Sequence, residues 1–192
     1  MLAAGAGRRM GGPKALVRDS GGTVWVVRAA RALAGGGCDP VLVVVGAAAD
    51  QVTAELAGEP VEVVGATGWQ EGMGASLRAG LAALARHPAP VAVVVTPVDV
   101  PGLTEDVVRR TAAGVVPDSL VRAVYDGSPG HPVVIGRDHW SGVAESSVGD
   151  QGARAYLATH QPGEIECADL ADGSDVDISA DLPAGHQVWS PG

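Results

Sequence analysis

Short valine-rich runs alternate with helical patterns along most of this chain, and this alternation constrains its fold more than any other feature. The apolar residues within each run are consecutive, as is typical of strands buried on both faces. We expect strands at 41–45, 61–64, 91–95, 120–125 and 133–135, and helices at about 25–34, 47–57, 76–87, 105–113 and 152–160. Strands that alternate with helices predict an α/β domain with a mainly parallel sheet.

The predicted helix at 76–87 shows the helical pattern most clearly. Leu77, Leu81 and Leu84 recur at positions i, i+4 and i+7, and Ser76 stands where it can cap the helix. The chain has no Phe, so its core must consist mainly of Val, Ala and Leu, which suits thin strands under small-residue helices. With 192 residues and no linker-like stretch, we expect residues 1–192 to form one domain.

Composition argues against several classes of partner. The chain has 13 basic and 22 acidic residues and a net charge of -9, which disfavours binding to nucleic acid or to an anionic membrane surface. Cys38 and Cys167 lack the spacing of a zinc site or a disulfide framework, which fits a reduced setting. No apolar run reaches the roughly 18 to 20 residues that span a bilayer. We expect a soluble cytoplasmic protein.

The first 14 residues form a glycine-rich, basic segment. Glycine lets backbone N–H groups approach an anion, and the cations add positive charge, so we expect this loop to bind the phosphates of a nucleotide. Its spacing matches neither the P-loop nor the dinucleotide fingerprint, and a mobile terminus is the alternative. The glycines are Gly5, Gly7, Gly11 and Gly12, and the cations are Arg8, Arg9 and Lys14.

Asp99 follows the predicted strand at 91–95, between prolines at positions 97 and 101 that stiffen the backbone. In open α/β sheets, ligands bind at the carboxyl ends of the strands. A rigid carboxylate beside a phosphate loop is suited to holding Mg²⁺ that bridges phosphate oxygens. The alternative is an Asp that belongs to a strand-to-helix turn or caps the next helix.

Two further polar residues are weaker candidates. Asp150 lies at the start of the predicted helix at 152–160, where it either caps the helix or completes the ligand set of a metal ion. His131 precedes Pro132 at the entrance of a strand, and a structural role is the alternative to a functional one.

Residues 68–76 form a second glycine-rich turn that opens a helix, which suits the close approach of a base or a sugar. For Trp69, simple packing is the alternative. We expect Asp175 and Asp177, near the C-terminus, to be turn or surface acids.

The order of these segments resembles that of MobA-like nucleotidyltransferases, and most closely their molybdenum cofactor cytidylyltransferase (MocA) branch. The resemblance covers nearly the whole chain and implies a three-layer, Rossmann-like nucleotidyltransferase fold. It also implies an enzyme that uses Mg²⁺ to transfer CMP from CTP to molybdopterin or its molybdenum form and releases pyrophosphate. The motifs are Leu-Ala-Ala-Gly-Ala-Gly-Arg-Arg-Met-Gly-Gly-Pro-Lys (2–14), Gly-Met-Gly-Ala-Ser-Leu (72–77), Pro-Val-Asp-Val-Pro (97–101), Gly-His-Pro-Val (130–133), Gly-Asp-Gln-Gly-Ala-Arg (149–154) and Asp-Val-Asp-Ile-Ser-Ala-Asp-Leu (175–182).

The resemblance also implies roles for individual residues. Arg9 and Lys14 contact the phosphates and act in catalysis with Asp99, while Asp99 and Asp150 hold the magnesium ion. His131 lies towards the pterin acceptor. The nucleotide-binding residues are Leu2, Ala3, Ala4, Gly5, Gly7, Arg9, Lys14, Gly74 and Ser76.

A phosphate monoester such as molybdopterin is already anionic near neutral pH, so its attack on the α-phosphorus needs no general base. We expect CTP over GTP, because Leu-Ala-Ala-Gly stands where the family's guanylyltransferases usually have Leu-Ala-Gly-Gly. The product would pass to a molybdoenzyme or its chaperone. The alternatives are GTP or another phosphorylated acceptor, a non-catalytic nucleotide- or cofactor-binding protein, and an NAD(P)H-dependent oxidoreductase of the same family.

Relatives carry several apolar residues before Leu-Ala-Ala-Gly, whereas Met1 directly precedes this motif here. We therefore expect a truncated first strand, and a natural start that lies upstream or a trimmed chain.

Overall fold

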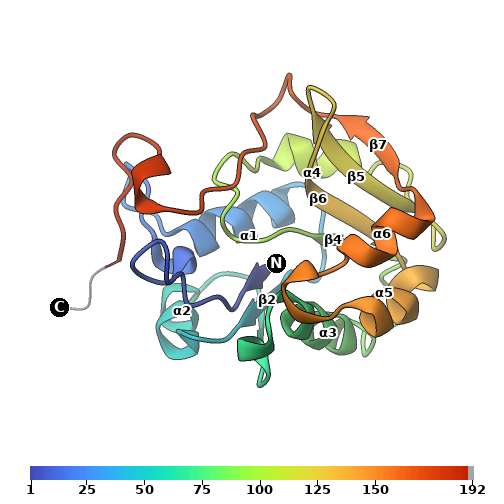
Figure 1. Ribbon diagram of the computed structural model, residues 1–192, viewed down its shortest axis with the longest axis horizontal. Helices are drawn as coiled ribbons and strands as arrows, with labels where there is room; N and C mark the ends of the chain where they lie inside the picture. The colour runs from blue at the N-terminus through green and yellow to red at the C-terminus, as the bar shows by residue number, and fades with distance from the viewer. Residues whose placement is uncertain (190–192) are drawn as a thin grey trace.

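The computed structural model describes residues 1–189, and its centre is a twisted, mainly parallel sheet (Figure 1). Strand β1 (Leu2–Ala3) pairs in parallel with β2 (Leu42–Val45), which pairs in parallel with β3 (Glu62–Gly65). On the other side of β1, Leu2 N donates to Thr96 O at 2.9 Å and Val98 N donates to Leu2 O at 3.0 Å. These bonds join β1 to the segment that follows β4 (Ala92–Val95).

The second half of the sheet has the order β4-β6-β5-β7. Strand β5 (Leu120–Tyr125) and strand β6 (Ser128–Gly136) form a hairpin, and β7 (Gly163–Glu166) pairs in parallel with β5. Asp126 and Gly127 connect the hairpin with φ of 50° and 75°. An Asp-Gly pair with positive φ at both residues is the turn whose twist matches two antiparallel strands. Among the described strands, β6 is therefore the one that runs against its neighbours.

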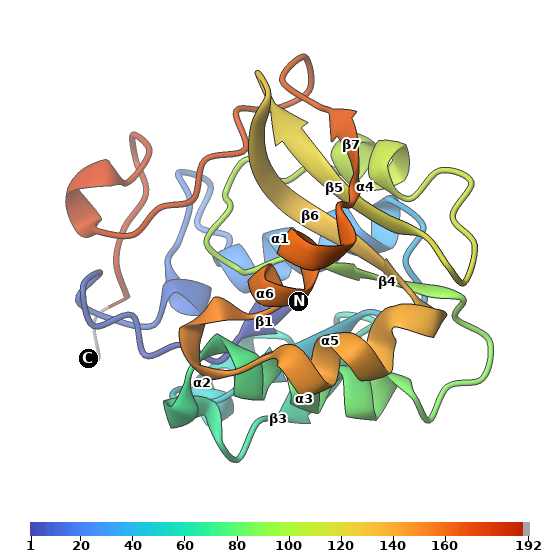
Figure 2. The same ribbon diagram turned by 45° about the vertical axis from the view of Figure 1, so that its right-hand side comes forward.

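Helices cover both faces of the sheet (Figures 1 and 2). Helices α1, α2 and α4 share one apolar core, and α3, α5 and α6 share the other, so the expected three-layer α/β fold is confirmed. Figure 2 shows α5 beside α3. The helices are α1 (Trp25–Gly35), α2 (Ala49–Glu55), α3 (Met73–Leu84), α4 (Glu105–Thr111), α5 (Trp140–Ser146) and α6 (Arg154–His160).

The local predictions need correction at the start of one helix and at two elements that they missed. Helix α3 begins at Met73 after Gly72, so Ser76 is buried inside the helix and does not cap it. Gly72 has a φ of 112°, and a Cβ there would lie 2.4 Å from Asp150 Oδ1, which explains why glycine precedes the helix. Strand β7 and helix α5 were not expected from the sequence pattern.

The first strand is as short as expected, and the start of the chain is buried. The Met1 amino group donates to Leu42 O at 2.8 Å, and its burial lowers its pKa to about 6. None of the helices in residues 1–189 has the length and apolar character needed to cross a membrane.

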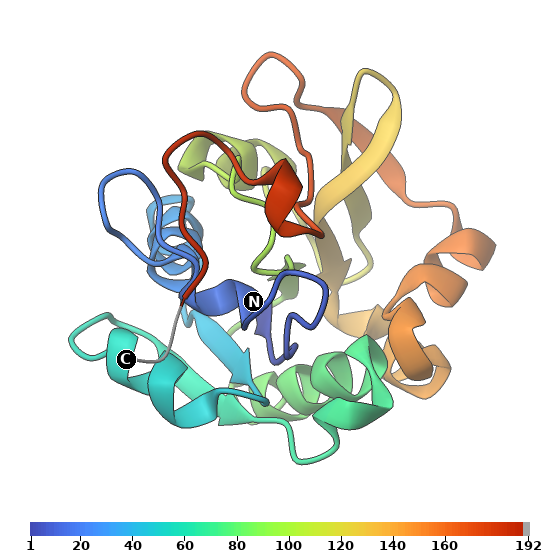
Figure 3. The same cartoon turned by 60° about the vertical axis from the view of Figure 1, so that its left-hand side comes forward.

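The C-terminal segment returns to the N-terminal half of the chain. Figure 3 shows this segment, in red, alongside the early residues, in blue. Arg18 pairs with Gln187 through backbone hydrogen bonds, and Val176 N donates to Asp99 O at 2.9 Å. Residues from both ends of the sequence thus meet at the carboxyl edge of β1 and β4.

Candidate active site

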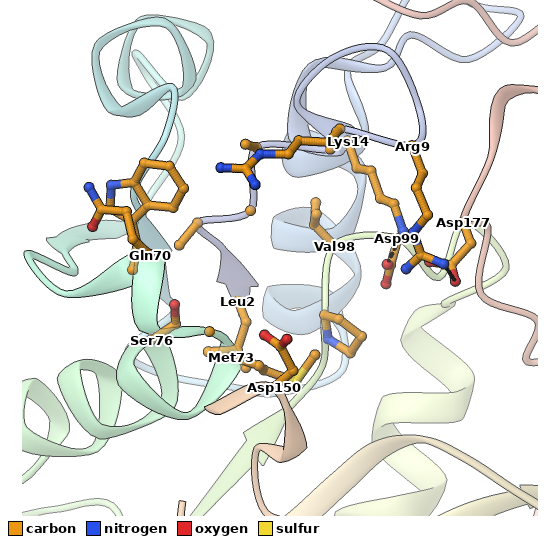
Figure 4. A pocket seen from close by; sticks show the side chains of 18 residues that line it. Leu2, Arg9, Lys14, Gln70, Met73, Ser76, Val98, Asp99, Asp150 and Asp177 are labelled. Carbon is orange, nitrogen blue, oxygen red and sulfur yellow. Dashed lines mark hydrogen bonds and ion pairs between the residues drawn. The ribbon is translucent and has the colours of Figure 1, made fainter. Parts of the chain in front are cut away.

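A cavity of ≈ 410 Å³ opens at the carboxyl ends of β1 and β4, where ligands bind in α/β sheets (Figure 4). Its walls come from the N-terminal loop, the turn and first residues of α3, and the loop after β4. Single residues of two later segments complete it. The lining residues are Leu2, Ala4, Gly5, Ala6, Gly7, Arg8, Arg9, Lys14, Trp69, Gln70, Gly72, Met73, Ser76, Pro97, Val98, Asp99, Asp150 and Asp177.

The N-terminal loop is folded around Gly7. The carbonyl of Gly7 accepts hydrogen bonds from the backbone N–H groups of Met10, Gly11 and Gly12 at 3.0, 3.0 and 3.2 Å. Gly7 has a φ of 60°, and a Cβ there would lie 1.8 Å from the Gly12 carbonyl oxygen, so a side chain at Gly7 is incompatible with this loop. Met10 is buried in the core. The loop is anchored and is not a free terminus.

Lys14 lies between two carboxylates that come from distant parts of the chain. Its Nζ donates to Asp99 Oδ2 at 2.8 Å and to Asp177 Oδ1 at 2.7 Å, and Arg9 pairs with the other oxygen of Asp177 at 3.1 Å. The side chains of Lys14 and Asp99 are 15% and 19% exposed, whereas that of Arg9 is 73% exposed. Lys14 and Asp99 therefore form the more desolvated centre of this cluster.

The pKa shifts reflect the same contacts. Burial alone would lower the pKa of Lys14, but its hydrogen bonds to Asp177 and Asp99 outweigh burial, and the pKa is raised. The hydrogen bond from Lys14, with its charge, lowers the pKa of Asp177. Lys14 is thus a fixed ammonium group near neutral pH.

Asp177 corrects an expectation, because it is not an ordinary turn or surface acid. It lines the cavity and contacts Lys14 and Arg9 of the N-terminal loop. The one sequence signal for it was the resemblance carried by residues 175–182. The local pattern gave none, since a single acid near the end of the chain, shortly after the turn-like residues 171–174, is typical of a turn or an exposed surface.

Asp150 also lines the cavity, but on the side of Gly72 and Met73 (Figure 4). It sits in a 3-10 turn at Gly149–Gln151, and α6 begins later, at Arg154, without a side-chain cap. Asp150 therefore does not cap that helix. Asp99 does not cap a helix either, because Thr104 caps α4 by accepting from Val107 N.

The oxygen atoms around this cavity fit a divalent cation that also binds phosphate. Asp99 Oδ1 is buried and has no hydrogen-bond partner in the described structure, so this carboxylate has unused acceptor capacity. No three or more His, Cys, Asp or Glu side chains in residues 1–189 are placed to hold a metal ion by themselves. Mg²⁺ in nucleotide sites needs only one or two carboxylates, because phosphates and waters supply the remaining ligands.

His131 lies close to Asp99 but does not line the cavity. Burial lowers the pKa of His131, and the charge of Asp99 opposes this effect. Its Nδ1 is buried without a hydrogen-bond partner. Contact between His131 and an acceptor stays a prediction.

The other end of the cavity is formed by Trp69, Gln70, Met73 and Ser76, together with Leu2. In Figure 4 the labelled side chains of Gln70 and Ser76 lie across the cavity from Asp99 and Asp177. The sequence predicted that the turn at 68–76 approaches a base or a sugar, with packing as the alternative for Trp69, and it singled out Ser76 but neither Gln70 nor Met73.

Two of the predicted nucleotide-binding residues lie outside the lining of the cavity. Ala3 belongs to the core, and a Cβ on Gly74 would meet the Ser147 carbonyl at 2.7 Å, so neither lines the cavity.

Comparison with known proteins places this arrangement in a family. Residues 1–164 match the family model described as the MobA-like NTP transferase domain. The chain belongs to the MobA-like NTP transferase family. The resemblance stated from the sequence motifs is therefore confirmed.

Relatives of this MobA-like protein have different names. It is 40% identical over 190 residues to nicotine blue oxidoreductase from Paenarthrobacter nicotinovorans, covering 92% of this chain and 90% of the relative. Among solved structures, a nucleotidyl transferase from Methanothermobacter thermautotrophicus is 20% identical with a TM-score of 0.78, covering 94% of this chain and 91% of that one.

Rv0371c from Mycobacterium tuberculosis H37Rv is 27% identical with a TM-score of 0.76, covering 94% of this chain and 92% of that one. The same mycobacterial protein was also solved in complex with manganese, and that structure is 24% identical with a TM-score of 0.71, covering 94% of this chain and 89% of that one. These similarities confirm the nucleotidyltransferase fold.

Proposed function

We propose that this protein is a metal-dependent nucleotidyltransferase that transfers CMP from CTP to a molybdopterin-type phosphate and releases pyrophosphate. The observation that carries the proposal is the position of Lys14. A largely desolvated ammonium group lies between two carboxylates, beside a loop rich in backbone N–H groups, in a fold shared with nucleotidyltransferases. This combination suits a triphosphate together with a divalent cation.

In the proposed reaction, an acceptor phosphate oxygen attacks the α-phosphorus of CTP. A new P–O bond forms, the bond to the β-phosphate oxygen breaks, and pyrophosphate leaves. The acceptor oxygen is already anionic, so the absence of a nucleophile–base pair in the lining is consistent with the reaction. The difficulty for the enzyme is repulsion between two polyanions.

The residues of the phosphate loop address that repulsion. Lys14 and Arg9 would release Asp177 and contact the triphosphate, while loop N–H groups orient it. Asp99 would hold Mg²⁺ together with one further carboxylate, either Asp150 or, once Lys14 releases it, Asp177, and phosphate oxygens and waters would complete the ligand set. When bound, the ion would neutralise charge on the phosphates. The manganese complex of the mycobacterial neighbour supports a divalent ion in this fold.

The opposite end of the cavity would receive the cytosine and ribose. Trp69 offers an aromatic face, and Gln70 and Ser76 offer hydrogen-bonding groups at the edge of the same cavity. We propose CTP over GTP from the Leu-Ala-Ala-Gly motif, and His131 as a residue towards the acceptor side. The product would serve a molybdoenzyme or its chaperone in the cytoplasm.

The test is pyrophosphate release by the full chain with CTP or GTP, Mg²⁺ and reduced molybdopterin, followed by mass spectrometry of the product. We expect a CMP-pterin adduct and a clear preference for CTP. A preference for GTP would refute the base assignment. Turnover only with a sugar phosphate or a phosphorylated alcohol would refute the acceptor. Binding of CTP and metal without turnover on any acceptor would indicate a non-catalytic protein.

A second candidate function rests on the 40% identical relative, which is named an oxidoreductase. It predicts oxidation of NAD(P)H in the presence of a reducible pigment, and consumption of NAD(P)H is followed at 340 nm. The incomplete dinucleotide fingerprint of the N-terminal loop argues against this candidate. NAD(P)H oxidation by the chain without any pyrophosphate release from CTP would reverse the order of the two proposals.

A further inference from the structure

Two buried polar atoms near the cavity lack hydrogen-bond partners, and they belong to neighbouring residues. They are Asp99 Oδ1 and His131 Nδ1. Leaving such a group unsatisfied costs about 1–3 kcal/mol, and native structures do so rarely. One atom is an acceptor and the other becomes a donor when it carries the ring proton, so each has the property that the other lacks.

The fold brings these residues together from adjacent strands. Asp99 lies in the loop after β4, and His131 lies in β6, which pairs antiparallel with β4 so that Val133 faces Val95. The Val95 carbonyl lies close to the imidazole, and Asp99 is the charged group that acts most strongly on it. Tyr125 Oη donates to the His131 carbonyl at 2.7 Å and holds the backbone in place.

The other oxygen of Asp99 is engaged by a residue that the proposed reaction needs elsewhere. Asp99 Oδ2 accepts from Lys14, which is the hydrogen bond recorded for this carboxylate within residues 1–189. Once Lys14 turns to a triphosphate, the carboxylate loses that restraint. A ligand of a metal ion binds best when a neighbouring donor fixes its orientation.

We propose that His131 is a positioning residue whose Nδ1–H donates to Asp99 Oδ1 in the nucleotide-bound state and orients that carboxylate towards the metal ion. The inference rests on the proposed function, in which Asp99 holds the metal. It gives His131 a role behind the cavity wall, in addition to the position towards the acceptor side that is proposed above. It also accounts for both unsatisfied atoms with one hydrogen bond.

The first test separates the contribution of the metal from that of the nucleotide. The affinity of the full chain for CTP is measured by calorimetry with excess EDTA and again as the manganese complex, MnCTP. In His131→Leu we expect affinity for MnCTP to fall about tenfold or more, with metal-free CTP unchanged. His131→Asn places an amide N–H near the position of Nδ1, so it should restore most of the MnCTP affinity.

His160→Leu is the matched control, because this exposed histidine lies on α6 outside the cavity and should leave both affinities unchanged. Equal loss of both CTP forms in His131→Leu, or no rescue by His131→Asn, would overturn the positioning role. A wild-type chain that binds neither form of CTP would instead overturn the proposed nucleotidyltransferase function.

The second test needs no substitution that threatens the fold. In wild-type protein with ¹⁵N-labelled histidine, the nitrogen shifts of His131 show which ring nitrogen carries the proton, and His131→Asn assigns the signal. We expect a protonated Nδ1 in the MgCTP complex, with a proton shift typical of a hydrogen bond to a carboxylate. An unprotonated Nδ1 in that complex would overturn the inference.

Discussion

The two ends of the cavity differ in how far their polar groups are already satisfied. At the end proposed for the phosphates, which we call the phosphate end, Lys14 binds Asp99 and Asp177, and Arg9 binds Asp177. The end proposed for the base, which we call the base end, is formed by residues 69–76. Trp69, Gln70 and Met73 line the cavity there, and the Gln70 side chain has no hydrogen bond within the described residues. One end is an ion-paired network, whereas the other is an open surface.

This difference indicates separate tasks. A ligand at the phosphate end must exchange partners with groups that are already paired, so its binding depends on strong charges. A ligand at the base end adds new contacts without breaking old ones, so that end suits selection between bases. Substitutions at the two ends should therefore affect different kinetic constants.

The largest effect is expected for Asp99→Asn. Loss of the central carboxylate should reduce metal-dependent pyrophosphate release by about 1,000-fold, because the metal loses its best-buried ligand. Asp118→Asn, at an exposed turn before β5, is the control and should retain full activity. Thermal unfolding checks that the fold is intact. Near-normal turnover in Asp99→Asn would remove Asp99 from the chemistry.

At the phosphate end, the more buried cation should contribute more to kcat/KM. Lys14→Ala should lower kcat/KM for CTP by about 100-fold, and Arg9→Ala by no more than about tenfold, because solvent screens the more exposed charge. Initial rates at varied CTP concentration give both values. If the two variants lose the same fraction of kcat/KM, burial does not determine how much each cation contributes to catalysis.

At the base end, Trp69→Ala should raise KM for CTP by about tenfold with kcat nearly unchanged, because stacking on a base is worth about 1–3 kcal/mol in both ground and transition states. The ratio of kcat/KM for CTP to that for GTP should change in Gln70→Ala. Steady-state kinetics with both nucleotides measure these effects. A fall in kcat alone in Trp69→Ala would contradict the division of tasks.

Asp177→Asn should act in opposite directions with and without metal. In EDTA, metal-free CTP should bind a few-fold more tightly, because Lys14 and Arg9 no longer share a competing carboxylate. With Mn²⁺, CTP should bind more weakly, because the metal loses a ligand. Calorimetry under both conditions measures the two affinities, and a change of the same sign in both would exclude the exchange of partners.

A smaller effect concerns stability and pH. The pKa of Asp177 is lowered in the folded state. Its contribution to the free energy of unfolding is therefore present above its unfolded pKa and is lost as pH falls through the folded value. The pKa of Lys14 is raised, so its contribution to the free energy of unfolding persists to alkaline pH. Because Asp177 is 43% exposed, the loss below about pH 4 should be at most about 1 kcal/mol. Urea unfolding of wild type and Asp177→Asn across pH measures it.

The sequence located most elements because their patterns are local. Consecutive valines predicted β2 and β4, and the strand expected at 120–125 is β5. It also located the N-terminal loop that lines the cavity, since Gly7 is required by its own backbone conformation and Lys14 stands out by its charge. The Asp-Gly pair at 126–127 is typical of an antiparallel hairpin, a feature that the expected elements did not include.

The residues that surround Lys14 were decided by the tertiary structure. Asp99 and Asp177 are 85 and 163 positions away in sequence, and neither neighbouring residues nor helical spacing indicates that Asp177 reaches the cavity. That contact depends on β1 lying between β2 and β4 and on the C-terminal segment returning across the sheet edge. The sequence by itself determined the family, the α/β layers and the glycine-rich N-terminal loop, because its motifs and short-range patterns specify these. Only the order in which the strands pair decided which acids form ion pairs with Lys14. The same order decided where His131 lies relative to Asp99.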